Sequence, residues 1–169
     1  MPNERVAFVS LGCAKNLVNT EQMMALAMDG GYTVTGDPET AEVAVVNTCG
    51  FIDSAKSEAI DVILELAKQK EAGKLRGILV AGCMVQRHGT EVQTLLPEVD
   101  GLLGCGSYEE ITRAIEEVLN GQKPQLFGDI NAPIQETRRI LTTPPWTAYL
   151  RIAEGCDNRC AYCVIPYLR

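Results

Sequence analysis

The first 121 residues alternate short apolar runs with segments of helical periodicity, and this alternation limits the possible folds more than any other feature of the sequence. The runs are continuously apolar, which is typical of parallel strands buried on both faces. They comprise residues 6–11, 43–46, 78–81 and a weaker run at 101–103, and residues 32–35 are expected to form a further strand. Between them, apolar residues recur at helical spacing, as in Ile111, Ala114, Ile115 and Val118. Strand followed by helix, repeated, predicts an α/β fold with a doubly wound, mostly parallel sheet.

A proline-rich stretch separates this region from the end of the chain. Residues 122–145 hold four prolines and show no regular period, so we interpret them as a linker between domains. Residues 146–152 are predicted to form one more strand. The sequence therefore predicts a first domain at residues 1–121, a linker at 122–145 and the start of a second domain at 146–169.

The charge is divided unevenly along the chain. The formal net charge is −7, residues 137–169 carry +3, and residues 1–136 therefore carry −10. Such an acidic region is not expected to bind nucleic acid directly, because phosphates repel it. No stretch approaches the roughly 20 uninterrupted apolar residues of a membrane helix, and the first residues lack the layout of a signal peptide. We therefore expect a cytoplasmic protein without a membrane partner, in which the seven cysteines are reduced and act as ligands or catalysts.

Three cysteines share one local context. Cys13, Cys49 and Cys83, called here the strand-end cysteines, each come directly after a predicted strand and before a helix. Because parallel strands end at the same edge of a sheet, we expect their thiols at one edge. The helix N-termini that begin there would stabilise thiolates. Three thiolates without a nearby histidine favour an iron–sulfur cluster, with one iron left open when the cluster has four.

Other interpretations of these cysteines remain open. Free cysteines often fill strand ends as small buried hydrophobic residues, although three equivalent positions make this less favoured. Structural zinc could use the strand-end cysteines with His88 as a fourth ligand, but this domain has a core of its own. His88 is otherwise expected to be a surface or loop residue. Cys105 follows a weaker strand, and we interpret it as a buried free thiol.

Three further cysteines lie close together near the end of the chain. The stretch CDNRCAYC spaces Cys156, Cys160 and Cys163, called here the loop cysteines, as C-x₃-C-x₂-C, with Tyr162 just before the third. On a compact loop this spacing allows three thiolates to bind one four-iron cluster and leaves its fourth iron open. A zinc knuckle is the alternative, and it would lack a fourth ligand because residues 164–169 hold no Cys or His.

The loop motif resembles the signature of radical S-adenosylmethionine (SAM) enzymes. That resemblance implies that the loop cysteines bind a 4Fe-4S cluster whose open iron chelates S-adenosyl-L-methionine, with Tyr162 near the adenine. Together with SLGCAKNLVNTE, NTCGFIDSAKSE, AGCMVQR, PEVDGLLG and YLRIAEGCDNRCAYCVIP, the motif is similar to the methylthiotransferases over nearly the whole chain. The stretches LGCAKN and NTCGFIDSA most resemble those of the branch that modifies an aspartate of small-subunit ribosomal protein twelve. Asn19 stands where that pattern would have an aspartate.

The resemblance implies a transferase with two 4Fe-4S clusters, one of them an auxiliary cluster on the strand-end cysteines. A radical from S-adenosylmethionine would remove hydrogen from the β-carbon of the target aspartate, which then takes a methylated sulfur from the auxiliary cluster. The partners implied are the ribosomal protein and a reduced flavodoxin or ferredoxin type electron donor. A complete radical SAM barrel needs on the order of 200 or more residues, so this chain is expected to be an inactive N-terminal fragment. A transfer-RNA methylthiotransferase and a non-catalytic iron–sulfur scaffold remain alternatives.

Overall fold

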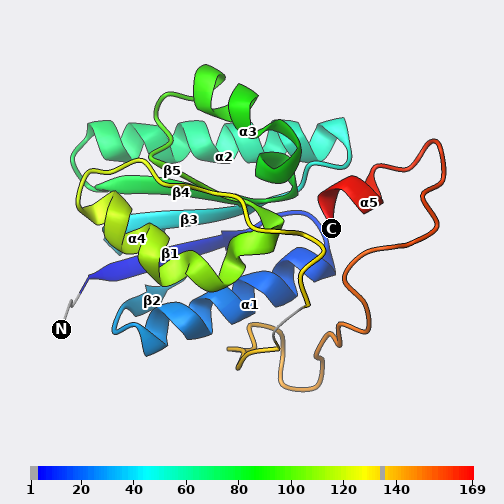
Figure 1. Cartoon of the computed structure of the whole chain (residues 1–169). Coiled ribbons are helices and arrows are strands. Elements are labelled where there is room, and N and C mark those ends of the chain that lie inside the picture. The colour runs from blue at the N-terminus through cyan, green and yellow to red at the C-terminus, as the bar shows by residue number, and fades with distance from the viewer. Residues whose placement is uncertain (1–3, 134–135) are drawn as a thin grey trace.

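The computed structural model describes residues 4–133 and 136–169 and contains one parallel sheet between two layers of helices (Figure 1). The strands run in the order β2-β1-β3-β4-β5-β6. Their bounds are β1 (Arg5–Ser10), β2 (Thr33–Thr35), β3 (Val43–Thr48), β4 (Gly77–Gly82), β5 (Gly101–Leu103) and β6 (Gln125–Leu126). The helices are α1 (Ala14–Asp29), α2 (Asp53–Glu71), α3 (Cys83–Leu95), α4 (Ile111–Leu119) and α5 (Ile165–Leu168), with short 3₁₀ turns η1 (Pro38–Thr40) and η2 (Cys105–Glu110).

The two faces of the sheet have separate cores. In Figure 1, α2 and α3 lie above the sheet, and α1 and α4 lie below it. Strand β3 is buried along its whole length, and its side chains alternate between the two cores. Ala44 and Val46 pack on the side of α2, whereas Val43 and Val45 pack on the side of α1 and α4. This double burial explains the continuous apolar runs and confirms the predicted doubly wound parallel sheet.

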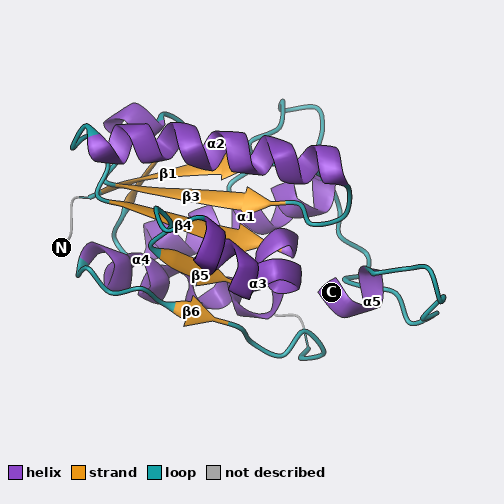
Figure 2. Ribbon diagram, turned by 90° about the horizontal axis from the view of Figure 1, so that it is seen from above, coloured by secondary structure: helices purple, strands orange, loops and turns teal. Residues whose placement is uncertain are grey.

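The direction of chain winding reverses between β1 and β3. From β1 the chain moves outward to β2, and from β3 it moves the other way through β4 and β5 to β6. Such a reversal leaves a crevice at the carboxyl ends of the two strands concerned, where ligands of open α/β sheets bind. In Figure 2 the strand arrowheads point toward the side on which α5 lies, so the end of the chain faces this edge.

Helix α4 follows the sequence pattern closely. Its four predicted core residues, Ile111, Ala114, Ile115 and Val118, are all buried. The helix ends at Leu119 with Asn120 as its C-cap, and Gly121 adopts φ +76, a left-handed conformation that glycine favours after a helix. None of the described helices is long and apolar enough to cross a membrane.

Two expectations for the second half of the chain need correction. The sheet continues past residue 121, because β6 pairs with β5 inside the stretch interpreted as a linker. Residues 146–152 do not form the predicted strand. A strand needs a neighbour for its backbone hydrogen bonds, and all the described strand pairings lie within the six-stranded sheet. The division into domains at residues 121 and 145 stays a prediction.

Candidate functional site

The strand-end cysteines all lie at the carboxyl edge of the sheet. Cys13 precedes α1 as its N-cap, Cys49 follows β3 directly, and Cys83 is the first residue of α3. Cys13 is exposed, Cys49 is half-buried and Cys83 is buried. Each position follows from the strand–turn–helix alternation, because every strand of a parallel sheet delivers its last residue to the same edge.

Two glycines let the three cysteine loops touch. Gly12 adopts φ +88, and a Cβ on it would lie 2.6 Å from the Cβ of Cys49. A Cβ on Gly50 would lie 2.6 Å from the carbonyl oxygen of Cys83. Any larger residue at either position would push the loops apart. The loop before Cys13 is therefore in contact with the loop of Cys49, and that loop is in contact with the start of α3.

A buried amide ties these loops together. Asn16 is fully buried one turn after Cys13, and its Nδ2 donates to the carbonyl oxygens of Leu11 at 2.9 Å and Thr48 at 3.0 Å. The Asn47 Nδ2 donates in turn to the carbonyl oxygen of Asn16 at 2.9 Å. These bonds join the ends of β1 and β3 to the first turn of α1. The geometry at this edge is therefore held by backbone groups as well as by packing.

The Cys83 thiol lies in a polar and partly cationic environment. Its Sγ accepts a hydrogen bond from Arg169 Nη2 at 3.3 Å and lies 3.9 Å from Asn16 Oδ1. Hydrogen bonding with the Cys105 thiol lowers the pKa of Cys83, burial opposes this, and the charge of Arg169 lowers the pKa further, to about 6. The hydrogen bond with Cys83, together with burial, raises the pKa of Cys105. Cys83 is thus the thiol of this pair that ionises near neutral pH.

The loop cysteines lie on irregular chain between residue 153 and α5. Cys156 and Cys160 are exposed, and Cys163 is half-buried. One turn is formed where the Cys163 N–H donates to the Cys160 carbonyl oxygen at 2.9 Å. Tyr162, the proposed neighbour of the adenine, is 93% exposed. These residues are close in the chain, as the sequence requires, but few contacts fix their side chains.

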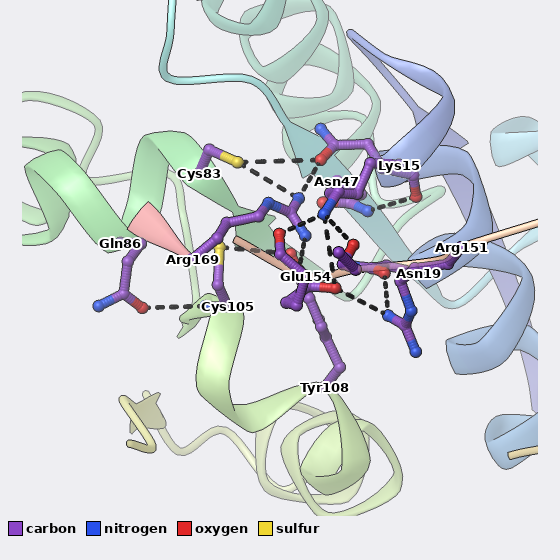
Figure 3. A network of polar contacts seen from close by, with 12 residues as sticks. Lys15, Asn19, Asn47, Cys83, Gln86, Cys105, Tyr108, Arg151, Glu154 and Arg169 are labelled. Atoms are coloured by element: carbon purple, nitrogen blue, oxygen red, sulfur yellow. Dashed lines mark hydrogen bonds and ion pairs between the residues drawn. The ribbon is translucent and has the colours of Figure 1, made fainter. Parts of the chain in front are cut away.

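An ionic network attaches this loop to α1 (Figure 3). Glu154 accepts hydrogen bonds from Arg169 at 2.5 Å and from Arg151 at 3.2 Å, and its Oε2 lies 3.9 Å from Lys15 Nζ. Lys15 also donates to the carbonyl oxygens of Ala153, at 2.7 Å, and of Glu154. Lys15 follows Cys13 by two residues, and Glu154 precedes Cys156 by two. The network therefore places the base of the second cysteine loop beside the first strand-end cysteine.

Further contacts hold the segment before this loop on α1. Arg151 donates to Asn19 Oδ1 at 2.9 Å, so the residue that departs from the family pattern contributes to this contact. Glu21 is 1% exposed, and its Oε1 accepts from the Thr142 N–H at 2.8 Å while its Oε2 lies 3.7 Å from Arg139 Nε. A buried carboxylate requires such partners. The stretch interpreted as a linker is therefore fixed to the first domain at this point.

Two residues set aside by the sequence analysis have defined surroundings. His88 lies within α3 at a kink, with φ −130, and its Nδ1 is 3.1 Å from Glu91 Oε2. Of the two expectations for His88, a surface or a loop residue, the loop is wrong, and the side chain is partly exposed on a helix. Cys105 is half-buried and receives a hydrogen bond from the Tyr108 hydroxyl at 3.5 Å. Cys105 also follows a parallel strand, β5, which is the signal that could have placed it beside Cys83.

The donor set at this edge fits a sulfur-ligated cofactor. Among residues 4–133 and 136–169, no three His, Cys, Asp or Glu side chains are grouped as ligands of a single metal ion. The three strand-end loops nevertheless pack together. The candidate ligands that they carry are thiols, the soft donors that iron–sulfur clusters use. The neighbouring cation, Arg169, suits an anionic group. The role of the six cysteines as ligands stays a prediction.

Sequence reasoning missed the polar residues that organise the edge, namely Asn16, Asn47, Glu154 and Arg169. A signal for the first of them was present. Asn16 and Asn19 lie on α1 in a run, 16–23, where most side chains are buried. Polar residues on the buried face of a helix need partners, so they mark a place where another segment contacts the helix. The identity of that segment, residues 136–169, was not encoded in any local pattern.

Comparison with known proteins gives consistent results. The chain is 49% identical over 171 residues to "Ribosomal protein uS12 methylthiotransferase RimO" of Pelotomaculum thermopropionicum, covering 98% of this chain and 37% of the relative. It is 49% identical over 166 residues to the protein of the same name from Symbiobacterium thermophilum, covering 98% of this chain and 34% of the relative. The relative of that name from Clostridioides difficile is 45% identical over 166 residues, with coverages of 98% and 37%.

The chain thus spans about a third of the length of these curated relatives. The family described as "Uncharacterized protein family UPF0004" matches residues 5–104, which run from β1 through the residue after β5. That range contains all three strand-end cysteines and the sheet that brings them to one edge. Because the match takes in more than half of the chain, this protein belongs to the family UPF0004.

Proposed function

We propose that this chain forms part of a methylthiotransferase that adds a methylthio group to the β-carbon of an aspartate in small-subunit ribosomal protein uS12. One observation carries the proposal: the three strand-end cysteines lie at one edge of the sheet, and the base of the loop that carries three further cysteines is attached beside them. The names of relatives that are 45–49% identical over 98% of the chain support this substrate.

Each cysteine set has its own part in the proposed enzyme. The strand-end cysteines would hold an auxiliary 4Fe-4S cluster, and the loop cysteines a second cluster that binds S-adenosyl-L-methionine near Tyr162. When bound, these groups supply radical formation, hydrogen removal from an unactivated carbon and the sulfur that is transferred. The residues of this chain position them: Asn16 fixes the strand-end loops, and Lys15 and Glu154 hold the second loop beside them.

The remaining assignments follow from this function. Residues 1–121 would form the auxiliary-cluster domain, 122–145 the connection, and 146–169 the beginning of the radical SAM domain. The enzyme would work in the cytoplasm, where ribosomal proteins are available, and would take its electrons from a reduced flavodoxin or ferredoxin type protein. This chain alone would not turn over, because a radical SAM barrel requires on the order of 200 or more residues.

Cofactor binding is tested by measuring iron and sulfide in anaerobically reconstituted protein. We expect a variant with Cys13, Cys49 and Cys83 replaced by alanine to lose about half of the iron. A variant with the three loop cysteines replaced by alanine should lose the other half. Cys105→Ala is the matched control and should keep all of it. Unchanged iron in the first triple variant would remove the auxiliary site, and zinc in place of iron would support the structural-zinc alternative.

The substrate is tested with the longer enzyme that contains this chain. A peptide carrying the target aspartate of uS12 should gain a methylthio group, detected as a mass increase by mass spectrometry, and transfer RNA should not. Modification of an adenosine in transfer RNA instead would favour the related RNA-modifying branch. Bound clusters without modification of either substrate would favour an iron–sulfur scaffold.

A further inference from the structure

Arg169 contacts both Cys83, a strand-end cysteine, and Glu154, at the base of the second cysteine loop (Figure 3). Its side chain is only 4% exposed. One guanidinium nitrogen, Nη2, donates to Cys83 Sγ at 3.3 Å and to Asn16 Oδ1 at 2.6 Å. The other, Nη1, donates to Glu154 Oε1 at 2.5 Å. A buried cation thus connects a strand-end cysteine to the residue that begins the second cysteine loop.

The same arginine closes that loop at its base. The loop cysteines all lie between Gly155 and Arg169, and these two residues are in contact. A Cβ on Gly155 would overlap with the carbonyl oxygen of Arg169, so only glycine allows the approach. Together with the Glu154–Arg169 ion pair, this contact fixes both ends of the loop at one point. The position of Arg169 on Cys83 therefore depends on the loop being closed.

The charge of Arg169 is well placed to act on a group bound at Cys83. Its guanidinium keeps a positive charge, because arginine stays protonated in proteins. Lys15 is a weaker candidate, because its Nζ donates to backbone carbonyls and its side chain is 30% exposed. In the described part of the chain, Arg169 is the cation whose contact with a strand-end sulfur is direct.

We propose that Arg169 is a positioning residue that donates an N–H···S hydrogen bond to the Cys83 sulfur when an iron–sulfur cluster occupies the strand-end cysteines, and that it thereby raises the reduction potential of that cluster. Hydrogen bonds to cluster sulfurs and nearby positive charge favour the reduced, more negative form. Low exposure strengthens the effect, because water screens the charge little. Closure of the second cysteine loop would thus set the potential of the first site. This inference rests on the proposed function.

The test isolates the auxiliary site. In this chain, with Cys156, Cys160 and Cys163 replaced by alanine, reconstituted anaerobically with iron and sulfide, the midpoint potential is measured by a redox titration followed by electron paramagnetic resonance. Arg169→Gln in this background should shift the midpoint to more negative values. Arg169→Lys, which keeps the charge, should restore most of the original value. Arg138→Gln is the matched control, because Arg138 is exposed and pairs with Asp29 at the far end of α1.

A second measurement avoids the risk that Arg169→Gln cannot hold iron. The same triple-alanine protein, labelled with ¹⁵N in its arginines only, is reduced and studied by pulsed electron paramagnetic resonance. A ¹⁵N coupling to the cluster is expected, and it should vanish in Arg169→Lys.

The outcomes are distinguishable. If the triple-alanine protein binds no iron, the auxiliary site fails, and this inference fails with it. If it binds iron but shows no ¹⁵N coupling, only the role of Arg169 is overturned. An unchanged midpoint in an Arg169→Gln protein with full iron content would overturn it equally.

Discussion

The two cysteine sets present the same donor atoms on different frameworks. The strand-end cysteines lie in the turns between strands and helices. Gly12 and Gly50 allow these turns to touch, and the buried Asn16 joins them by hydrogen bonds. The loop cysteines lie on irregular chain that contacts the domain through charged side chains around Glu154. Backbone packing therefore builds the first site, whereas ionic contacts place the second.

This difference has energetic consequences. A buried polar group without its partner costs about 1–3 kcal/mol, so the contacts at the strand ends are strong constraints on the native state. The second loop is held instead by ion pairs of Glu154, whose side chain is 18% exposed, with Arg169, which is 4% exposed, and with Lys15, which is 30% exposed. The strand-end site is thus expected to exist wherever the domain is folded, while the second loop can detach without unfolding the sheet.

The largest effect is expected at Gly82, the residue before Cys83. It adopts φ 95 and ψ −157, a conformation available almost only to glycine. A Cβ there would overlap with Asn47 Oδ1 and lie 2.6 Å from the carbonyl oxygen of Thr48. Gly82→Ala should lower the free energy of unfolding by about 4 kcal/mol, from backbone strain and overpacking together. Urea denaturation followed by circular dichroism measures this.

Gly121→Ala is the control for that substitution. Gly121 also has positive φ, at +76, but a Cβ added to it would have no heavy atom within 4 Å. Gly121→Ala should lower the free energy of unfolding by about 1 kcal/mol, from backbone strain alone. Equal losses in the two variants would show that the strand-end turn is not tightly packed, and the contrast between the two cysteine sets would weaken.

The next largest effect is expected at Asn16. Asn16→Ala removes the donor of two hydrogen bonds and leaves the carbonyl oxygens of Leu11 and Thr48 without it. The free energy of unfolding should fall by about 3 kcal/mol. Asn120→Ala, an exposed amide at the end of α4, should change stability by less than about 0.5 kcal/mol. A small effect at Asn16 would mean that packing alone holds the strand-end loops.

A pH effect on stability is expected from the Cys83 and Cys105 pair in metal-free, reduced protein. The lowered pKa of Cys83, about 6, means that between pH 6 and the ordinary thiol pKa of 9.0 the unfolded chain binds one proton more than the folded chain. Stability should therefore rise with pH in that window, by at most about 1.4 kcal/mol per pH unit. Above it, the raised pKa of Cys105 should reverse the trend.

The resulting maximum near the ordinary thiol pKa is measured by urea denaturation at a series of pH values. Cys83→Ala should abolish the rise in stability at pH values below this maximum. Cys156→Ala, which removes an exposed thiol of the second loop, should leave the curve unchanged. A pH dependence that survives Cys83→Ala would assign the titration to another group.

Local pattern was sufficient for five of the six strands and for the position of the strand-end cysteines. The continuous run at 43–46 predicted a strand buried on both faces, and the position of Cys49 after it followed from chain direction alone. Pattern was insufficient where long-range contacts decide. Ser107 begins the sequence of an N-terminal capping box, which predicts a helix start there, yet its hydroxyl accepts from the Gly128 N–H and no side chain caps α4.

The second half of the chain shows the same limit more strongly. Residues 146–152 have the composition of a strand but no neighbouring strand to bond, so their local preference is not realised. Arg169 gave no signal in sequence, because its contacts with Asn16 and Cys83 span 153 and 86 residues. These contacts form only because the C-terminal segment docks on the first domain. The docking depends on charged side chains, and the local periodicity of the sequence does not reveal their partners.

The smallest effect is expected at Lys15, and it tests the attachment directly. Lys15→Met removes the ammonium group that donates to the carbonyl oxygens of Ala153 and Glu154. The free energy needed to open the loop should fall by about 1 kcal/mol. The sheet should be unaffected, because it does not depend on this contact. Hydrogen exchange measured by mass spectrometry should therefore quicken about fivefold in peptides covering residues 153–164, and global stability should change little.

Lys56→Met serves as the control, since Lys56 pairs with Asp53 within the first turn of α2. It should leave exchange in residues 153–164 unchanged. If Lys15→Met instead quickened exchange throughout β1 and β3, the loop and the sheet would open as one unit. The two cysteine sets would then share a single framework, because loss of an ionic contact at one would be felt equally at the other.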